Sequence, residues 1–138
     1  MAITPEQKEL ARHRFNRAEE TLKESIAALA RQSVSLSINR AYYSVFYAMR
    51  AFLAIVDKDS SKHTGVVSLF NQYFIKTVIV SEISLKPIQS LMDLRHEGDY
   101  QDFAKTTEEE AAGAIESAKM MIEHMKTILE KLLEVNNR

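Results

Sequence analysis

The sequence lacks cysteine entirely and contains only three glycines and two prolines among its 138 residues. Without cysteine the chain cannot form disulfides, hold zinc or iron–sulfur clusters through thiolates, or use a thiol as a nucleophile. This composition suits a reducing compartment. Because glycine and proline are the residues that most disfavour helix interiors, their scarcity favours long helices.

Long apolar runs and an excess of one charge are missing too. The most apolar stretch, residues 41–56, is interrupted by Arg50 and is shorter than the roughly 20 residues that cross a bilayer. The N-terminus becomes charged within a few residues, unlike a signal peptide. The formal net charge of −1 predicts no strong overall attraction to nucleic acid or membranes. We therefore expect a cytoplasmic protein without a membrane partner.

What the chain does have is apolar periodicity. With 46% hydrophobic and 27% charged residues, it is typical of one globular domain spanning residues 1–138. Apolar residues at steps of three and four predict helices over about 5–31, from within 33–39 to 56, over 63–77 and 87–98, and from 107 onward. Gly98 is expected to weaken or end the fourth helix, and residues 78–84 to form a loop or helical turn. The predicted fold is an all-α, up-and-down bundle of four to five helices.

Capping residues support these boundaries. Thr4 and Gln7 have the spacing of a capping box, with Pro5 between them at the first helical position. Thr107 and Glu110 repeat the spacing before the last helix, and Ser84 could cap the fourth.

The second predicted helix carries a polar stripe beside its apolar face. Arg40, Tyr43, Tyr47 and Arg50 follow one another at steps of three, four and three residues, which places them in line. Alternating guanidinium and phenol groups can hold phosphate and stack a nucleobase. The alternative is that these side chains rim the core, with hydroxyls in water and arginine stems over apolar surface.

The densest polar cluster is the segment 93–100, DLRHEGDY. If the helix frays at Gly98, these side chains can converge: Arg95 could neutralise phosphate and His96 could act as a general base. The alternatives are a solvated helix end with weak local ion pairs, or ion pairs among Arg95, Asp99 and Arg40 that only fix the bundle.

Metal and cofactor motifs are not found. His96 and Glu97 begin an H-E-x-x-H pattern, but Tyr100 stands where the second histidine is required. A di-iron bundle needs two Glu-x-x-His motifs and two further glutamates, which the chain does not supply. We expect neither a metal nor a cofactor. His63, two residues before Gly65, could be a helix cap or a contact, and its role stays open.

Three ordered segments resemble a known family. Residues 39–51, NRAYYSVFYAMRA, are similar to the R-A-Y-Y-x-x-F-x-A-x-R-A signature of small prokaryotic HEPN proteins. Residues 63–70, HTGVVSLF, resemble the H-x-G-x-x-x-x-F element that follows it, and residues 95–100 resemble an R-x-x-x-D-Y signature. Together they cover about residues 37–103.

The resemblance implies an all-α bundle that forms a homodimer. Many HEPN proteins are metal-independent ribonucleases, and many are toxins paired with a minimal nucleotidyltransferase. In the ribonucleases an arginine and a histidine are separated by four to six intervening residues, and two protomers bring these motifs together in a cleft. There the arginine holds the scissile phosphate and the histidine helps the ribose 2′-hydroxyl attack it. Arg95 matches this arginine. The matching histidine is replaced, because four intervening residues lead to Tyr100 and longer spacings to Gln101 and Asp102.

The departure leaves two function hypotheses. In the first, the protein is an RNA-acting toxin-type component of a toxin–antitoxin pair, in which Arg95 binds phosphate, Tyr100 or Asp99 replaces the histidine, and Arg40 and Tyr43 line the cleft. In the second, it is a non-catalytic module that binds nucleotide, RNA or a partner protein. Arginine and tyrosine bind phosphate and bases without transferring a proton, so the motif suits both. Tyr100 could also be a contact or a target of the partner.

Overall fold

The computed structural model describes residues 2–80, 86–100 and 105–135, the side chains of 97–100 and 135 excepted. Its elements are α1 (Pro5–Ala30), α2 (Val34–Ala54), α3 (His63–Phe70), a short π-helix (Asn71–Ile75), α4 (Pro87–Tyr100) and α5 (Glu108–Val135). The expected all-α bundle is confirmed. Among the described residues no helix is long and apolar enough to cross a membrane.

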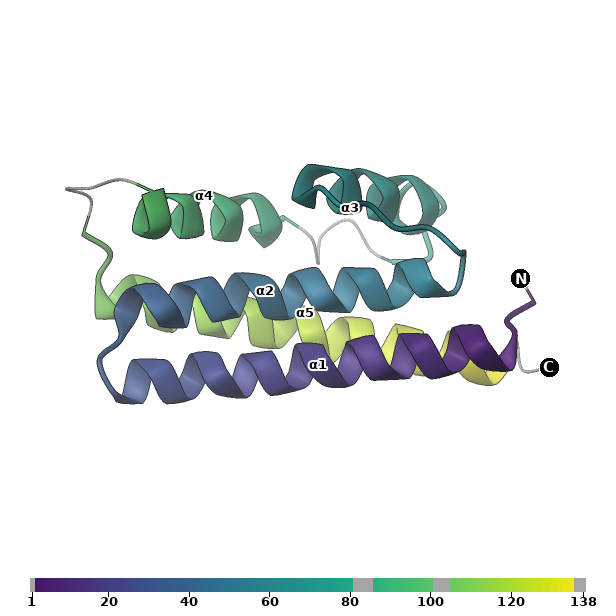
Figure 1. Cartoon of the computed structure of the whole chain (residues 1–138), viewed down its shortest axis with the longest axis horizontal. Coiled ribbons are helices and arrows are strands. Elements are labelled where there is room, and N and C mark those ends of the chain that lie inside the picture. Colours follow the sequence, from purple (N-terminus) through teal and green to yellow (C-terminus); the bar gives the residue numbers. More distant parts are fainter. Residues whose placement is uncertain (1, 81–85, 101–104, 136–138) are drawn as a thin grey trace.

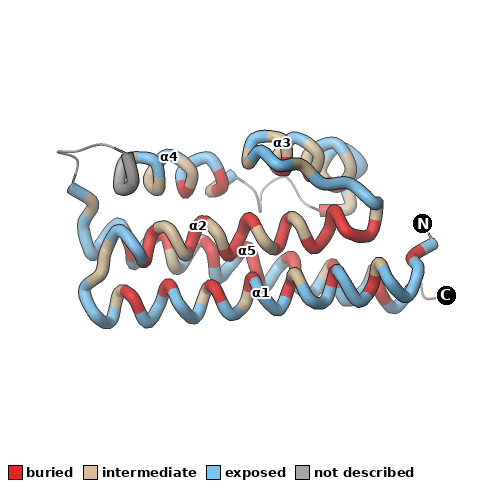
Figure 2. The backbone as a smooth tube through the Cα atoms, viewed as in Figure 1, coloured by how far each residue is buried: buried red, intermediate tan, exposed pale blue. Residues whose placement is uncertain are grey.

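Helix α2 is the centre of the bundle (Figure 1). Helices α1 and α5 run along one side of it, while the shorter α3 and α4 lie on the other side. The N- and C-terminal ends of the chain lie at the same end of the bundle. Figure 2 shows that α2 is buried over most of its length, whereas α1 keeps an exposed outer face. Packing on both sides explains why α2 is more apolar than the other two long helices, α1 and α5.

Helix α2 packs against α1 through small residues and against Phe70 and Phe74 through an aromatic residue. Ser25 of α1 and Ser37 of α2 are fully buried and exchange hydrogen bonds, each hydroxyl donating to the other residue's carbonyl at 2.6 and 2.9 Å. Two buried serines let the helix backbones approach closely. Further along α2, Phe52 packs edge-on against Phe70 and Phe74, with ring centroids 5.5 and 5.1 Å apart.

The predicted helix starts are confirmed where they lie among the described residues. Thr4 and Gln7 form a reciprocal capping box at α1. Thr107 and Glu110 form another at α5, where each backbone N–H donates to the other side chain at 3.0 Å. The expected cap Ser84 lies outside the described residues.

Two predicted boundaries differ from the structure. Gly98 is expected to weaken or end the fourth helix, and an end there is wrong, because α4 continues to Tyr100. One glycine in a helix costs only about 1 kcal/mol relative to alanine, an amount that packing on α2 can offset. The third helix ends at Phe70 rather than Thr77 and passes into the π-helix, in which the N–H of Lys76 donates to the carbonyl of Asn71. This shift keeps Phe74 buried beside Phe52.

Candidate functional site

Four aromatic side chains of α2 form a continuous surface that contacts α3 and α4 at one end and α1 at the other. Tyr42, Tyr43, Phe46 and Tyr47 fall on one side of the helix because residues three and four apart are neighbours on its surface. Successive ring centroids lie 5.1 to 5.9 Å apart, from Tyr42 through Tyr43 to Phe46 and Tyr47. Tyr42 is buried, whereas Tyr43 and Tyr47 are half-buried. The surface therefore joins the core to the solvent.

Arg95 of α4 lies over this aromatic surface. Its guanidinium carbon is 4.9 Å from the centroid of the Tyr42 ring and 5.6 Å from that of Tyr43. The side chain is half-buried. A guanidinium at this distance from two aromatic rings is attracted by their electron-rich faces, and stacking limits its rotation. The residue that the sequence predicts to hold phosphate is thus placed by two tyrosines.

His63, the first residue of α3, completes the group. Its Nδ1 lies 3.2 Å from the hydroxyl oxygen of Tyr42, and its Nε2 lies 3.3 Å from that of Tyr43. The imidazole also packs on Phe46, with centroids 4.6 Å apart. Lys62, not His63, is the N-cap of α3, so the question left open by the sequence is answered: His63 is a contact residue. We call Tyr42, Tyr43, His63 and Arg95 the Arg95 cluster.

Burial and the charge of Arg95 set the protonation states of Tyr42 and His63. Burial raises the pKa of Tyr42 to about 12, opposed in part by Arg95, so Tyr42 stays a neutral phenol. The pKa of His63 lies below its usual value, first because the ring is partly desolvated and second because Arg95 repels a second positive charge. At neutral pH the imidazole is therefore uncharged and one of its nitrogens carries a lone pair.

Arg40, Tyr43 and Tyr47 lie along the predicted stripe of α2. The guanidinium carbon of Arg40 is 5.1 Å from the ring centroid of Tyr43, and one of its nitrogens is 3.6 Å from a carboxylate oxygen of Glu24. Arg17 of α1 stacks 4.6 Å from the ring centroid of Tyr47 and donates to its hydroxyl at 3.3 Å. Guanidinium groups thus alternate with phenol rings along this edge of the bundle.

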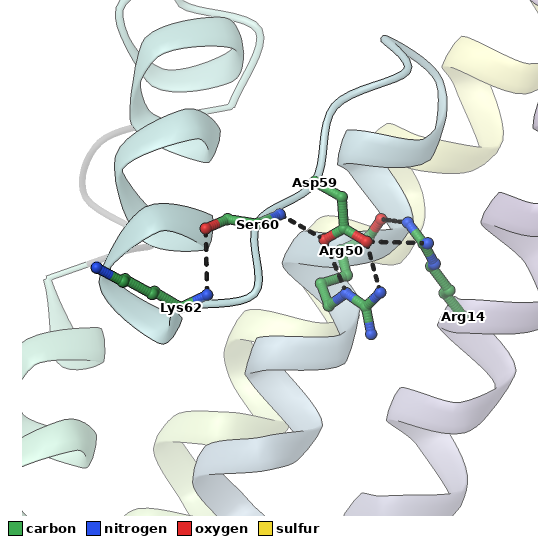
Figure 3. Close-up of polar contacts among 5 residues, drawn as sticks. All are labelled: Arg14, Arg50, Asp59, Ser60 and Lys62. Carbon is green, nitrogen blue, oxygen red and sulfur yellow. Dashed lines mark hydrogen bonds and ion pairs between the residues drawn. The ribbon is translucent and has the colours of Figure 1, made fainter.

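Arg50, the last residue of the stripe, takes part in a different set of contacts (Figure 3). Its Nε and Nη2 donate to the two carboxylate oxygens of Asp59 at 3.2 and 2.7 Å. Arg14 of α1 approaches the same carboxylate at 3.4 Å and donates to the backbone carbonyl of Arg50 at 3.0 Å. The structure therefore places Arg50 in an ion pair that ties the 55–62 loop to α1 and α2.

This loop positions His63. The N–H of Ser60 donates to Asp59 Oδ1 at 2.8 Å, and the N–H of Lys62 donates to Ser60 Oγ at 3.2 Å (Figure 3). Gly65 lies directly against Ser60, and a Cβ at Gly65 would collide with the serine hydroxyl. Tight contacts thus run from Arg50 through the loop to the first turn of α3, where His63 sits.

The remaining predicted residues do not join the Arg95 cluster in the described part of the chain. His96 is exposed, because α4 stays helical there and adjacent residues point about 100° apart. The side chains of Asp99 and Tyr100 lie outside the described residues. No group of three histidine, aspartate or glutamate residues that could hold a metal ion is found among the described residues.

Sequence reasoning missed two members of the cluster as site residues. The spacing of Tyr42 places it on the apolar face of its helix, and its buried ring does belong to the core. What the periodicity could not show is that its hydroxyl meets a histidine 21 residues further along the chain. The available signal was the pair His63 and Gly65, since a glycine that near a helix start can mark close backbone packing.

Comparison with known proteins agrees with the family resemblance of residues 39–51, 63–70 and 95–100. A family model described as the HEPN domain matches residues 11–128, a range that includes the whole Arg95 cluster. The chain is a HEPN-domain protein.

Relatives of this HEPN-domain protein cover nearly all of its length. "Putative toxin MJ0605" of Methanocaldococcus jannaschii is 32% identical over 116 residues, which is 84% of this chain and 86% of the relative. A protein of Thermotoga maritima named "UPF0332 protein" is 30% identical over 116 residues, or 84% and 88% of the two chains. "Putative toxin MJ0142" of Methanocaldococcus jannaschii is 26% identical over 115 residues, or 83% and 78%. The resemblance found in the sequence is thereby confirmed.

Proposed function

We propose that this HEPN-domain protein is the RNA-acting, toxin-type component of a toxin–antitoxin pair, and that it binds single-stranded RNA or nucleotide at the Arg95 cluster. The observation that carries the proposal is the stacking of Arg95 on Tyr42 and Tyr43. Arginine recognises phosphate through paired N–H donors, and aromatic faces stack bases without regard to sequence. Two relatives with the word toxin in their names support the toxin assignment.

The extended stripe supports a polymeric ligand rather than a lone phosphate. Arg40 on Tyr43 and Arg17 on Tyr47 repeat the pairing of a guanidinium with a ring beside the Arg95 cluster. Successive nucleotides of a single strand need such a repeat, one phosphate and one base at a time. Because the net charge of the chain is −1, the attraction of RNA phosphates must come from the arginines of this region and not from the protein as a whole.

RNA cleavage without a metal is the activity we propose for this site. Arg95 would neutralise the charge that develops on the phosphate during attack by the ribose 2′-hydroxyl. One observation favours a second function, a non-catalytic binding module: the motif position after Arg95 holds Tyr100 instead of a histidine. Tyrosine, with an ordinary pKa of about 10, is a poor base at neutral pH. The two functions share the ligand and differ in whether a bond breaks.

We further propose a homodimer and a nucleotidyltransferase partner, as the family resemblance implies. The mass of the purified protein in light scattering tests the first. Co-expression with a minimal nucleotidyltransferase from the same organism tests the second, through co-purification and relief of any growth arrest. A monomer would remove the two-protomer cleft from the proposal, and failure to co-purify or to relieve an arrest would remove the partner.

Binding to RNA is tested by fluorescence anisotropy with a labelled single-stranded oligonucleotide. Arg95→Met keeps much of the side-chain volume and removes the charge, so we expect a loss of affinity of at least about tenfold. The salt dependence of log Kd should also become shallower by about one unit, as expected for one lost phosphate contact. Arg12→Met is the matched control, because Arg12 is exposed on the side of α1 that faces α5. Equal affinity of all three proteins would refute the proposed site.

A further inference from the structure

Metal-free RNA cleavage needs a proton-transfer group, and the motif position after Arg95 does not supply a histidine. Tyr100 occupies that position, and the neighbouring His96 is exposed. A different histidine, from another helix and 32 positions earlier in the sequence, meets Arg95 on the same two tyrosines. We infer that His63 is the general base of this site and accepts the proton of the attacking ribose 2′-hydroxyl. This inference rests on the proposed function.

The two tyrosine contacts give the imidazole a defined orientation. A neutral imidazole has one N–H and one lone pair, so one tyrosine accepts a hydrogen bond from the ring while the other donates to it. Tyr42 is 1% exposed and holds Nδ1 from the core side. Tyr43 is half-buried and contacts Nε2 from the outer side. The proposed arrangement is Nδ1–H donating to Tyr42 and the Nε2 lone pair accepting from Tyr43.

In the proposed complex the substrate takes the place of the Tyr43 hydroxyl, which contacts Nε2 of His63 from the outer side. A ribose 2′-hydroxyl that replaces the Tyr43 hydroxyl finds the Nε2 lone pair at hydrogen-bond distance, while Tyr42 keeps the ring in place from behind. This is the arrangement in which a third group orients a base for its reactant. Tyr42 serves this role without becoming charged itself, because burial keeps it a phenol.

His63 is also reachable from solvent. A shallow pocket of about 550 Å³ is bounded by His63 together with Phe46, Arg50, Asp59, Ser60 and Ser61. Arg50 and Asp59 neutralise one another across this pocket, whereas Arg95 is the charge that acts on the imidazole. The lowered pKa of His63 supports the proposal by keeping the ring in its proton-accepting form at neutral pH.

The step conserves atoms and charge. The 2′-oxygen forms a bond to phosphorus as its proton passes to Nε2 of His63, and the bond from phosphorus to the 5′-oxygen breaks. Water protonates the departing 5′-oxygen, and the resulting hydroxide removes the proton from the imidazolium. The products are a 2′,3′-cyclic phosphate and a 5′-hydroxyl, with His63 neutral again. Arg95 would balance the negative charge that grows on the phosphoryl oxygens.

The test compares the wild-type protein with His63→Gln, and with His96→Gln as the matched histidine control. Glutamine can both donate and accept a hydrogen bond, so it can keep the tyrosine contacts without acting as a base. Cleavage is followed on a single-stranded RNA oligonucleotide, and binding on the same sequence made as DNA, which lacks the attacking hydroxyl. Circular dichroism checks that the helical content is unchanged.

We expect His63→Gln to lower the cleavage rate by about 10²-fold or more, the range of general acid–base catalysis, with Kd for the DNA strand changed less than threefold. His96→Gln should cleave at the wild-type rate. The wild-type rate should fall as the pH drops through the His63 pKa, which lies below the usual histidine value. This pH profile needs no variant, so it tests the inference even if His63→Gln folds poorly.

The possible outcomes separate the inference from the proposed function. Cleavage that survives in His63→Gln, or that is lost only in His96→Gln, overturns the inference and leaves the ribonuclease standing. A wild-type protein that binds RNA without cleaving it overturns the inference and favours the binding module. A wild-type protein that neither binds nor cleaves RNA overturns the proposed function as well.

Discussion

Gly65 offers the sharpest test of how the protein places His63. In Gly65→Ala the new Cβ would collide with the hydroxyl of Ser60 and lie 2.8 Å from the serine Cβ, closer than two carbons can pack. The hydroxyl cannot simply rotate away at no cost, because it accepts a hydrogen bond from the N–H of Lys62 at 3.2 Å. The loop must therefore move, and His63, two residues before Gly65, must move with it.

The expected cost follows from this overlap. Forcing an extra methyl into a packed site destabilises proteins by about 1–3 kcal/mol. Alanine is the better helix former by up to about 1 kcal/mol, which offsets part of that cost near the start of α3. We therefore expect Gly65→Ala to lower the free energy of unfolding by about 1–2 kcal/mol, measured by urea titration with circular dichroism. The NMR signals of the His63 ring, which packs on Phe46, should shift.

A double-mutant cycle isolates the contact. Ser60→Gly removes both serine atoms that the new Cβ would meet, so Gly65→Ala should be neutral or stabilising in that background. A coupling free energy of at least about 1 kcal/mol between the two sites is the predicted result. The reasoning is refuted if Gly65→Ala costs the same in both backgrounds, or nothing in either.

Two further predictions concern stability. Ser25→Ala should lower the free energy of unfolding by about 1–2 kcal/mol in urea titrations, because it removes the buried hydroxyl that donates to the Ser37 carbonyl; an unchanged midpoint would contradict the buried pair. Because the pKa of His63 is lower in the folded chain, the unfolded chain binds more protons at this residue. The contribution of His63 to the free energy of unfolding is therefore full above the unfolded pKa of about 6.5, and it is lost as the pH falls through the lower folded pKa. Thermal unfolding at several pH values should show this decline in the wild type and less of it in His63→Gln, and identical profiles would contradict it.

The periodicity of the sequence predicts the helices because apolar residues recur at steps of three and four on the faces that they bury. It places Thr4 and Thr107 correctly as caps and locates the aromatic stripe on α2. It fails where the outcome depends on packing between helices. The break expected at Gly98 does not occur, and the third helix changes to a π-helix after Phe70.

The candidate site likewise contains residues that the sequence predicts and contacts that it does not predict. Tyr43 is identifiable because it lies on the stripe of α2, and Arg95 because it lies in the dense polar segment 93–100 and begins the R-x-x-x-D-Y signature. The partnership of Tyr42 with His63 leaves only the indirect signal of Gly65 near the start of α3, since the contact joins residues 21 positions apart in the sequence. Arg50 has the spacing of a site residue, yet Asp59 pairs with it across that loop. Long-range polar contacts of this kind become visible only in three dimensions.

Expression of the protein alone in a bacterial host, beside Arg95→Ala, tests the central claim most directly. Growth and the integrity of cellular RNA are followed together, with immunoblots to confirm equal protein levels. We predict growth arrest and RNA cleavage with the wild type, and neither with Arg95→Ala. Normal growth with intact RNA from well-folded wild-type protein, or equal arrest by both proteins, would contradict an RNA-acting toxin that works through Arg95.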